Sequence, residues 1–138
     1  MKDKDSKTTT KTHKQTLVLE YLFGHIPMSL LWENISTTHG LSEWFADKVV
    51  ADGIDYTFYW DDESESAILK QSRLGVYVRF HWTDDDNPKS FFEFRINEDA
   101  LTRDVVLSIT DMVDPEEVES ATELWNLQVA DLQKKLGV

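Results

Sequence analysis

The sequence predicts an α+β domain in which a curved antiparallel sheet grips a long C-terminal helix. Several segments between residues 54 and 110 alternate apolar and polar residues, which is the pattern of strands with one buried face. The connections between these segments are short, so the strands must pair antiparallel. An amphipathic helix closes the chain, and its apolar stripe can cover the dry face of the sheet.

The N-terminal part of this domain reads as one strand and two short helices. Apolar residues alternate over 16–23, and Pro27 then suits the first turn of a helix over 28–35. We expect a break at 36–40 and a second short helix at 41–45. The residues expected to face inward from the two helices are Met28, Leu31, Trp32, Ile35, Leu41, Trp44 and Phe45.

Five further strands are expected over 54–60, 66–71, 76–82, 92–96 and 105–110. One face of these strands is apolar, with Ile54, Tyr56, Phe58, Trp60, Val76, Val78, Phe80, Trp82, Phe92, Phe94, Ile96, Val105, Leu107 and Ile109. The opposite face is polar, with Asp55, Thr57, Arg79, His81, Glu93, Arg95, Ser108 and Thr110. The sheet therefore has one wet face and one dry face, and the dry face needs a cover.

The terminal helix has clear start and stop signals. Asp114 is the expected N-cap, Pro115 the first helical residue, and Gly137 ends the helix after Leu136. Its inward stripe is Val118, Ala121, Trp125, Val129, Leu132 and Leu136.

Charge and composition exclude several classes of function. The chain carries 14 Lys and Arg against 26 Asp and Glu, a formal charge of −12. Residues 1–14 hold five Lys and two Asp, so we expect a disordered basic tail before a strongly acidic domain at 15–138. Such a body repels nucleic acid and anionic membranes. No stretch is apolar enough to span a membrane and no secretion signal is present, so we expect a cytoplasmic protein.

No catalytic or metal-binding motif stands out. The chain has no Cys, and its histidines lack the spacing of a zinc site. The run 84–86 (Asp-Asp-Asp) fails the calcium-loop register and is expected to be a solvated hairpin tip. There is no nucleophile elbow and no Gly-rich phosphate loop. We therefore assign no catalytic residue, no metal ligand and no cofactor.

The order of several short motifs resembles a known family. Pro27 opens a helix with Leu31-Trp32, and Ile35-Ser36-Thr37, Gly40-Leu41, Trp44-Phe45 and Asp52-Gly53 follow. Phe58-Tyr59-Trp60, Phe80-His81-Trp82, Leu107-Ser108-Ile109-Thr110, Leu124-Trp125, Leu132 and Leu136 complete the series. The chain resembles the START-like, or SRPBCC, superfamily, and most of all the group related to activators of a heat-shock chaperone ATPase. The resemblance implies a helix-grip fold around an apolar cavity. Its members bind lipids, sterols, polyketides or plant hormones, some are cyclases or aromatases, and some are co-chaperones.

The aromatic set is the one informative constellation for function. We expect these rings to point into the interior between sheet and helix. There they either fill the core or line an apolar ligand cavity. A polar group inside would orient a ligand, and Gln128 and Tyr56 are the candidates. The candidate cavity residues are Trp44, Tyr56, Phe58, Trp60, Phe80, Trp82, Phe92, Phe94, Trp125 and Gln128.

Three hypotheses of function follow. The first is a non-enzymatic domain that holds a small hydrophobic or lipid-like molecule. The second is a co-chaperone-like interaction protein with a filled core that binds a protein partner through its surface. The third is a cyclase-type enzyme, which requires a general base inside the grip, and the apolar face offers none. Monomer and homodimer both remain open, because an edge strand can pair between subunits.

Overall fold

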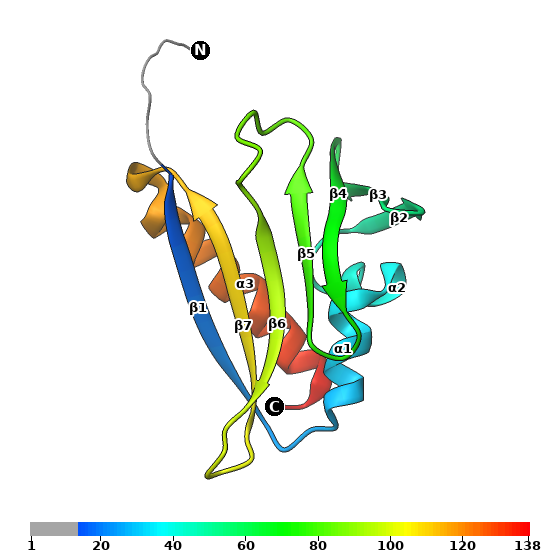
Figure 1. The fold of residues 1–138 in the computed structure, drawn as a ribbon. Helices are drawn as coiled ribbons and strands as arrows, with labels where there is room; N and C mark the ends of the chain where they lie inside the picture. The colour runs from blue at the N-terminus through cyan, green and yellow to red at the C-terminus, as the bar shows by residue number, and fades with distance from the viewer. Residues whose placement is uncertain (1–13) are drawn as a thin grey trace.

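Seven antiparallel strands form one sheet, and helices cover one of its two faces in the computed structural model, which describes residues 14–138 (Figure 1). The expected tail at 1–14 lies outside the described residues except for Lys14. In chain order the elements are β1 (Gln15–Gly24), α1 (Met28–Ser36), α2 (Thr38–Leu41), β2 (Lys48–Asp52), β3 (Asp55–Trp60), β4 (Glu63–Arg73), β5 (Tyr77–Trp82), β6 (Phe92–Glu98), β7 (Val105–Val113), the 3-10 turn η1 (Pro115–Glu117) and α3 (Val118–Leu136).

The strand order is β1-β7-β6-β5-β4-β3-β2, so the first two strands of the chain form the two edges. In Figure 1, α3 crosses behind β1, β7 and β6, while α1 and α2 lie behind the β4–β5 side. The predicted α+β helix-grip architecture is confirmed. The core lies between sheet and helices, where α3 contributes Trp125, Val129 and Leu132.

The two short helices meet at a tight corner. The Thr37 hydroxyl accepts a hydrogen bond from the Gly40 amide at 2.8 Å and donates one to the Glu33 carbonyl at 2.8 Å. This cap starts the second helix at Thr38, so the predicted break at 36–40 and helix at 41–45 are wrong in their bounds. A Cβ on Gly40 would lie 2.2 Å from the Glu33 carbonyl oxygen, so only glycine lets the two helices approach this closely.

Strand β2 was missing from the sequence prediction. It is an edge strand in which only Val49 is buried, so it lacks the alternation by which strands are recognised. A turn at Gly53, with φ of +64°, joins it to β3. Ile54 lies in this turn with 56% of its surface exposed, so its placement on the dry face was wrong. Met28 is also exposed, because Leu31 and Ile35 make the core contacts of α1.

The start of the last helix differs from the prediction, and its end agrees. The Asp114 side chain makes no capping hydrogen bond, and its carbonyl instead accepts the Glu117 amide in a 3-10 turn. Such a turn satisfies amides that have no partner at a helix start. Gly137 ends the helix in the left-handed conformation, with φ of +78°.

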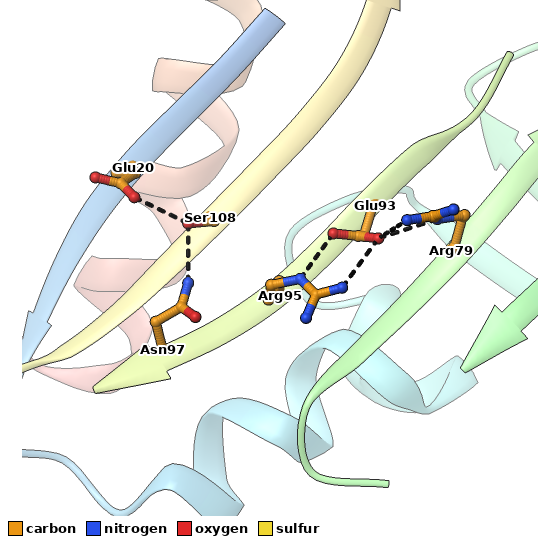
Figure 2. A network of polar contacts seen from close by, with 6 residues as sticks. All are labelled: Glu20, Arg79, Glu93, Arg95, Asn97 and Ser108. Carbon is orange, nitrogen blue, oxygen red and sulfur yellow. Dashed lines mark hydrogen bonds and ion pairs between the residues drawn. The ribbon is translucent and has the colours of Figure 1, made fainter. Parts of the chain in front are cut away.

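The outer face of the sheet is not uniformly wet. Glu93 and Ser108 are buried, at 5% and 7% exposure, although no helix covers them. Neighbouring side chains cover them: Arg79 and Arg95 close over Glu93, and Asn97 and Glu20 hydrogen-bond to Ser108, as Figure 2 shows. The predicted polar face is therefore polar in chemistry and partly buried by its own ion pairs.

Candidate functional site

The interior of the grip is one continuous cluster of aromatic rings. Every predicted ring contacts at least one other, with centroid separations from 4.6 Å for Trp82 and Phe92 to 6.5 Å for Phe58 and Phe92. Large rings that touch edge to face or in offset stacks fill space densely and stabilise each other. The members of this cluster, which we call the ring cluster, are Trp44, Phe45, Tyr56, Phe58, Trp60, Phe80, Trp82, Phe92, Phe94 and Trp125.

Phe45 is the hub of the ring cluster. Its ring meets Phe58 at 5.1 Å, Trp60 at 5.6 Å and Phe94 at 5.5 Å, and stacks on Trp125 with an interplanar angle of 9°. The sequence analysis placed Phe45 inward but did not include it among the candidate site residues. Only the tertiary fold brings the short 42–47 segment between the sheet and α3.

One end of the ring cluster is more accessible than the rest. Phe58, Phe80 and Phe94 are at most 1% exposed. Trp60 and Trp82 are only partly buried, and their rings lie 6.3 Å apart at the ends of β3 and β5. We call these two indoles the open end of the cluster. A molecule that enters the grip there would meet aromatic surface first.

The two predicted polar groups have different surroundings. The Gln128 amide donates to the Phe45 carbonyl at 3.1 Å, and the Trp60 indole N–H donates to the same oxygen at 2.8 Å. Gln128 therefore links α3 to the 42–47 segment that carries Phe45, which we call the hub segment. The Tyr56 ring is buried, at 9% exposure, and burial raises the pKa of its hydroxyl. Within residues 14–138 no hydrogen bond is formed by that hydroxyl, which leaves it available to a ligand.

A carboxylate that the sequence analysis missed faces the interior. β7 continues to Val113, so the alternation Leu107, Ile109, Asp111 puts Asp111 on the inner face. One carboxylate oxygen accepts the Trp125 indole N–H at 2.9 Å and the other accepts the Met112 amide at 2.9 Å. Burial raises the pKa of Asp111, and these hydrogen bonds oppose that shift only in part.

Asp111 was missed because the predicted strand ended at residue 110. The run Thr110–Val113 reads as Thr-Asp-Met-Val, and an Asp is uncommon within strands. The signal that could have revealed it is the alternation of inward-facing residues on β7. This alternation runs from Leu107 and Ile109 through Asp111 to the buried Val113. The expectation that the apolar face offers no candidate general base is therefore wrong, because Asp111 lies on it.

The predicted site residues come together around the ring cluster. Nine predicted rings belong to the ring cluster, and Gln128 borders it through the Phe45 carbonyl. Among residues 14–138, no three His, Asp or Glu side chains gather in a way that could hold a metal ion. No helix in that part of the chain is both long and apolar enough to cross a membrane.

Comparison with known proteins assigns the family. The START-like superfamily domain matches residues 11–138, which is nearly the whole chain. The chain belongs to the START-like superfamily. No curated protein matches this START-like chain.

Solved structures agree with the family assignment. The solution NMR structure of BfR322 from Bacteroides fragilis is 39% identical, with 90% of this chain and 92% of that chain covered and a TM-score of 0.60. DynU16, encoded in the dynemicin biosynthetic locus, is 15% identical over 89% of this chain and 47% of its own length, with a TM-score of 0.71. The Aha1 dimer from Colwellia psychrerythraea is 10% identical over 86% of this chain and 93% of its own, with a TM-score of 0.68. The last two likenesses concern the fold alone.

Proposed function

We propose that this START-like domain is a non-enzymatic binding protein that takes a small hydrophobic, lipid-like molecule into the open end of its ring cluster. The observation that carries the proposal is the pair of partly exposed indoles, Trp60 and Trp82, at the end of an otherwise closed aromatic interior. Apolar sites with a few convergent polar groups are typical of small-molecule binding.

Each polar neighbour has a role in this proposal. Asp111 holds the Trp125 indole in place and so fixes one of the rings that a ligand would contact. Gln128 holds the hub segment against α3 and so shapes the inner wall. The Tyr56 hydroxyl, on β3, offers an orienting hydrogen bond to a ligand. The ligand that fits is largely apolar with one hydrogen-bonding end.

An enzymatic role has weaker support. A general base must reach the proton it removes and must be free to do so. Both oxygens of Asp111 already accept a hydrogen bond, from the Trp125 indole and the Met112 amide. Asp111 therefore suits the positioning of a ring and a ligand better than proton transfer.

A neutral fluorescent apolar dye, Nile red, tests the proposal, together with native mass spectrometry after incubation with a lipid extract. We expect saturable dye binding that extracted lipid displaces. Trp82→Leu removes one indole of the open end and should weaken dye binding about tenfold, which corresponds to about 1.4 kcal/mol for a lost aromatic contact.

Trp32→Leu is the matched control, because Trp32 is also a partly buried Trp but belongs to α1 and lies outside the ring cluster. Its dye affinity should stay within about twofold of the parent value. Circular dichroism checks that both variants fold. Absence of saturable binding, or equal losses in the two variants, would contradict the proposal.

The alternative is a co-chaperone-like protein that binds a protein partner through its surface. The continuous ring contacts favour it, because a filled interior leaves little room for a ligand. A chain without saturable dye binding that nevertheless captures one protein from its own cell extract in a salt-sensitive way would favour this alternative.

A further inference from the structure

A hollow lies on the outer face of the sheet, away from the helices. It has a volume of about 340 Å³ and sits between β4, β5 and the 83–91 loop. Its walls include Lys70, Gln71, Arg79, Lys89 and Phe91. This volume lies within the range of small-molecule pockets. We call it the outer pocket.

A β-bulge builds one wall of the outer pocket. Leu69 pairs with Phe80 and Gln71 pairs with Arg79, so Lys70 is the extra residue between two neighbouring pairs. In a regular strand Lys70 and Gln71 would point to opposite faces. The bulge lets both consecutive side chains line the same hollow, and bulges commonly re-aim side chains beside functional sites.

Arg79 lines the outer pocket with a guanidinium group that neighbouring side chains hold in place. Its Nε and Nη2 donate to one oxygen of Glu93 at 3.0 and 2.8 Å, and its guanidinium lies 4.1 Å from the centre of the Phe91 ring. These contacts hold the guanidinium in one orientation. Within residues 14–138 its remaining nitrogen, Nη1, has no hydrogen-bond partner. A fixed guanidinium edge is well suited to bind an anion.

The outer pocket is positive in a strongly negative protein. Glu93 is shared between Arg79 and Arg95, as Figure 2 shows, so one carboxylate serves two guanidinium groups. In the described part of the chain no carboxylate lies within ion-pair distance of Lys70 or Lys89. The acidic run at 84–86 belongs to the same 83–91 loop, and Lys14 pairs with its middle residue, Asp85, at 2.7 Å.

We propose that the outer pocket binds a small organic anion, whose carboxylate or phosphate is held by Lys70, Arg79 and Lys89 and whose apolar part lies on Phe91. The rest of the surface carries excess negative charge and repels large polyanions. A small anion can enter the local positive field without meeting that surface. The proposal concerns the face opposite the ring cluster and does not depend on the function proposed for it.

NMR titration of the labelled protein at low ionic strength tests the proposal with defined probes. Benzoate and phenyl phosphate present the two anionic groups on an apolar ring, inorganic phosphate lacks the ring, and benzyl alcohol lacks the charge. We expect saturable shifts around Lys70, Lys89 and Phe91 with a Kd of about 1 mM or tighter for one of the two ring-bearing anions. Which of them binds more tightly distinguishes a carboxylate site from a phosphate site.

The double variant Lys70→Glu/Lys89→Glu should weaken this binding at least tenfold. Its control, Lys134→Glu/Lys135→Glu, makes the same change in net charge on α3, behind the sheet, and should leave the affinity within about twofold. Arg79→Lys, which keeps the charge but loses the planar guanidinium edge, should also weaken binding. Dye binding at the open end, measured in parallel, should be unaffected by the Lys70 and Lys89 changes.

Three outcomes would overturn the outer-pocket proposal. One is the absence of saturable shifts with every anionic probe. Another is equal binding of benzyl alcohol, because charge would then play no part. The last is equal loss in both double variants, because the effect would then come from net charge and not from the outer pocket.

Discussion

Replacement of Glu93 by Gln is the sharpest test of how the outer face is stabilised. The Glu93 side chain is 6% exposed and accepts hydrogen bonds from Arg79 and Arg95 at 2.8–3.0 Å. Breaking a fully buried ion pair costs about 3–5 kcal/mol. Here both guanidinium groups are about one-third exposed and can turn to water after the change, so we expect a cost nearer 2 kcal/mol.

Urea denaturation followed by Trp fluorescence measures this cost. With a urea dependence of about 2 kcal/mol per molar, the midpoint of Glu93→Gln should fall by about 1 M at neutral pH. The matched control is Glu98→Gln, which removes a carboxylate from the same strand. Its partner Arg103 is 72% exposed, so this change should cost less than about 0.5 kcal/mol.

The difference in the free energy of unfolding between the parent and Glu93→Gln should also depend on pH. Burial alone would raise the pKa of Glu93, but the hydrogen bonds and charges of Arg95 and Arg79 outweigh it and hold the pKa below its ordinary value. A carboxyl with a lowered folded pKa stabilises the protein above its unfolded pKa, and this stabilisation is lost as the pH falls through the folded pKa. The free energies of unfolding of the parent and of Glu93→Gln should therefore become more similar as the pH falls. If Glu93→Gln costs no more than Glu98→Gln at neutral pH, the reasoning fails.

Three further variants test other parts of the structure. Gly40→Ala places a methyl group against the Glu33 backbone and should lower the free energy of unfolding by about 3 kcal/mol, measured by urea denaturation. The control Gly75→Ala, in an open turn, should lower it by about 1 kcal/mol. Equal losses would refute the close approach of α1 and α2. Asp111→Asn offers one acceptor where the carboxylate offers two, so it loses the hydrogen bond from either Trp125 or Met112. Burial raises the pKa of Asp111, so its carboxylate lowers the stability of the parent as the pH rises above the folded pKa. The free energy of unfolding of the variant relative to the parent should therefore be more favourable at pH 7 than near pH 3. A pH-independent difference would contradict this account. Trp125→Phe leaves the buried Asp111 carboxylate without its indole donor and should cost about 2 kcal/mol, checked by the thermal midpoint; an unchanged midpoint would show that the bond contributes nothing.

Much of the fold could be predicted because its patterns are local. The alternation at Phe92, Phe94 and Ile96 marks a buried strand face wherever that strand lies in the sheet, and all three residues are buried. The helix end at Gly137 follows from a residue type that accepts the left-handed conformation. Strand β2 could not be predicted in this way, because an exposed edge strand has no apolar period.

The candidate site could be predicted only in part. Each predicted ring lies in the ring cluster. A large aromatic side chain on the apolar face of an element is buried between that element and its neighbours, where it contacts other rings. Whether these rings surround a ligand is a matter of tertiary spacing that periodicity does not contain. Phe45, the hub, comes from a segment with no regular structure, so its central place follows only from the packing of α3 over the sheet.

By itself, the order of residues determined the fold class, the two faces of most strands, the stripe of the terminal helix and the family, because each depends on the spacing of neighbours along the chain. The tertiary structure alone decided that Asp111 binds Trp125, that Gly40 rests against Glu33, and that a bulge in β4 places Lys70 and Gln71 beside the same hollow. The contact of Asp111 joins β7 to α3, the bulge depends on how β4 pairs with β5, and the close approach of Gly40 depends on a sharp turn between two helices. Their geometry is therefore set by how the elements pack and not by any local period.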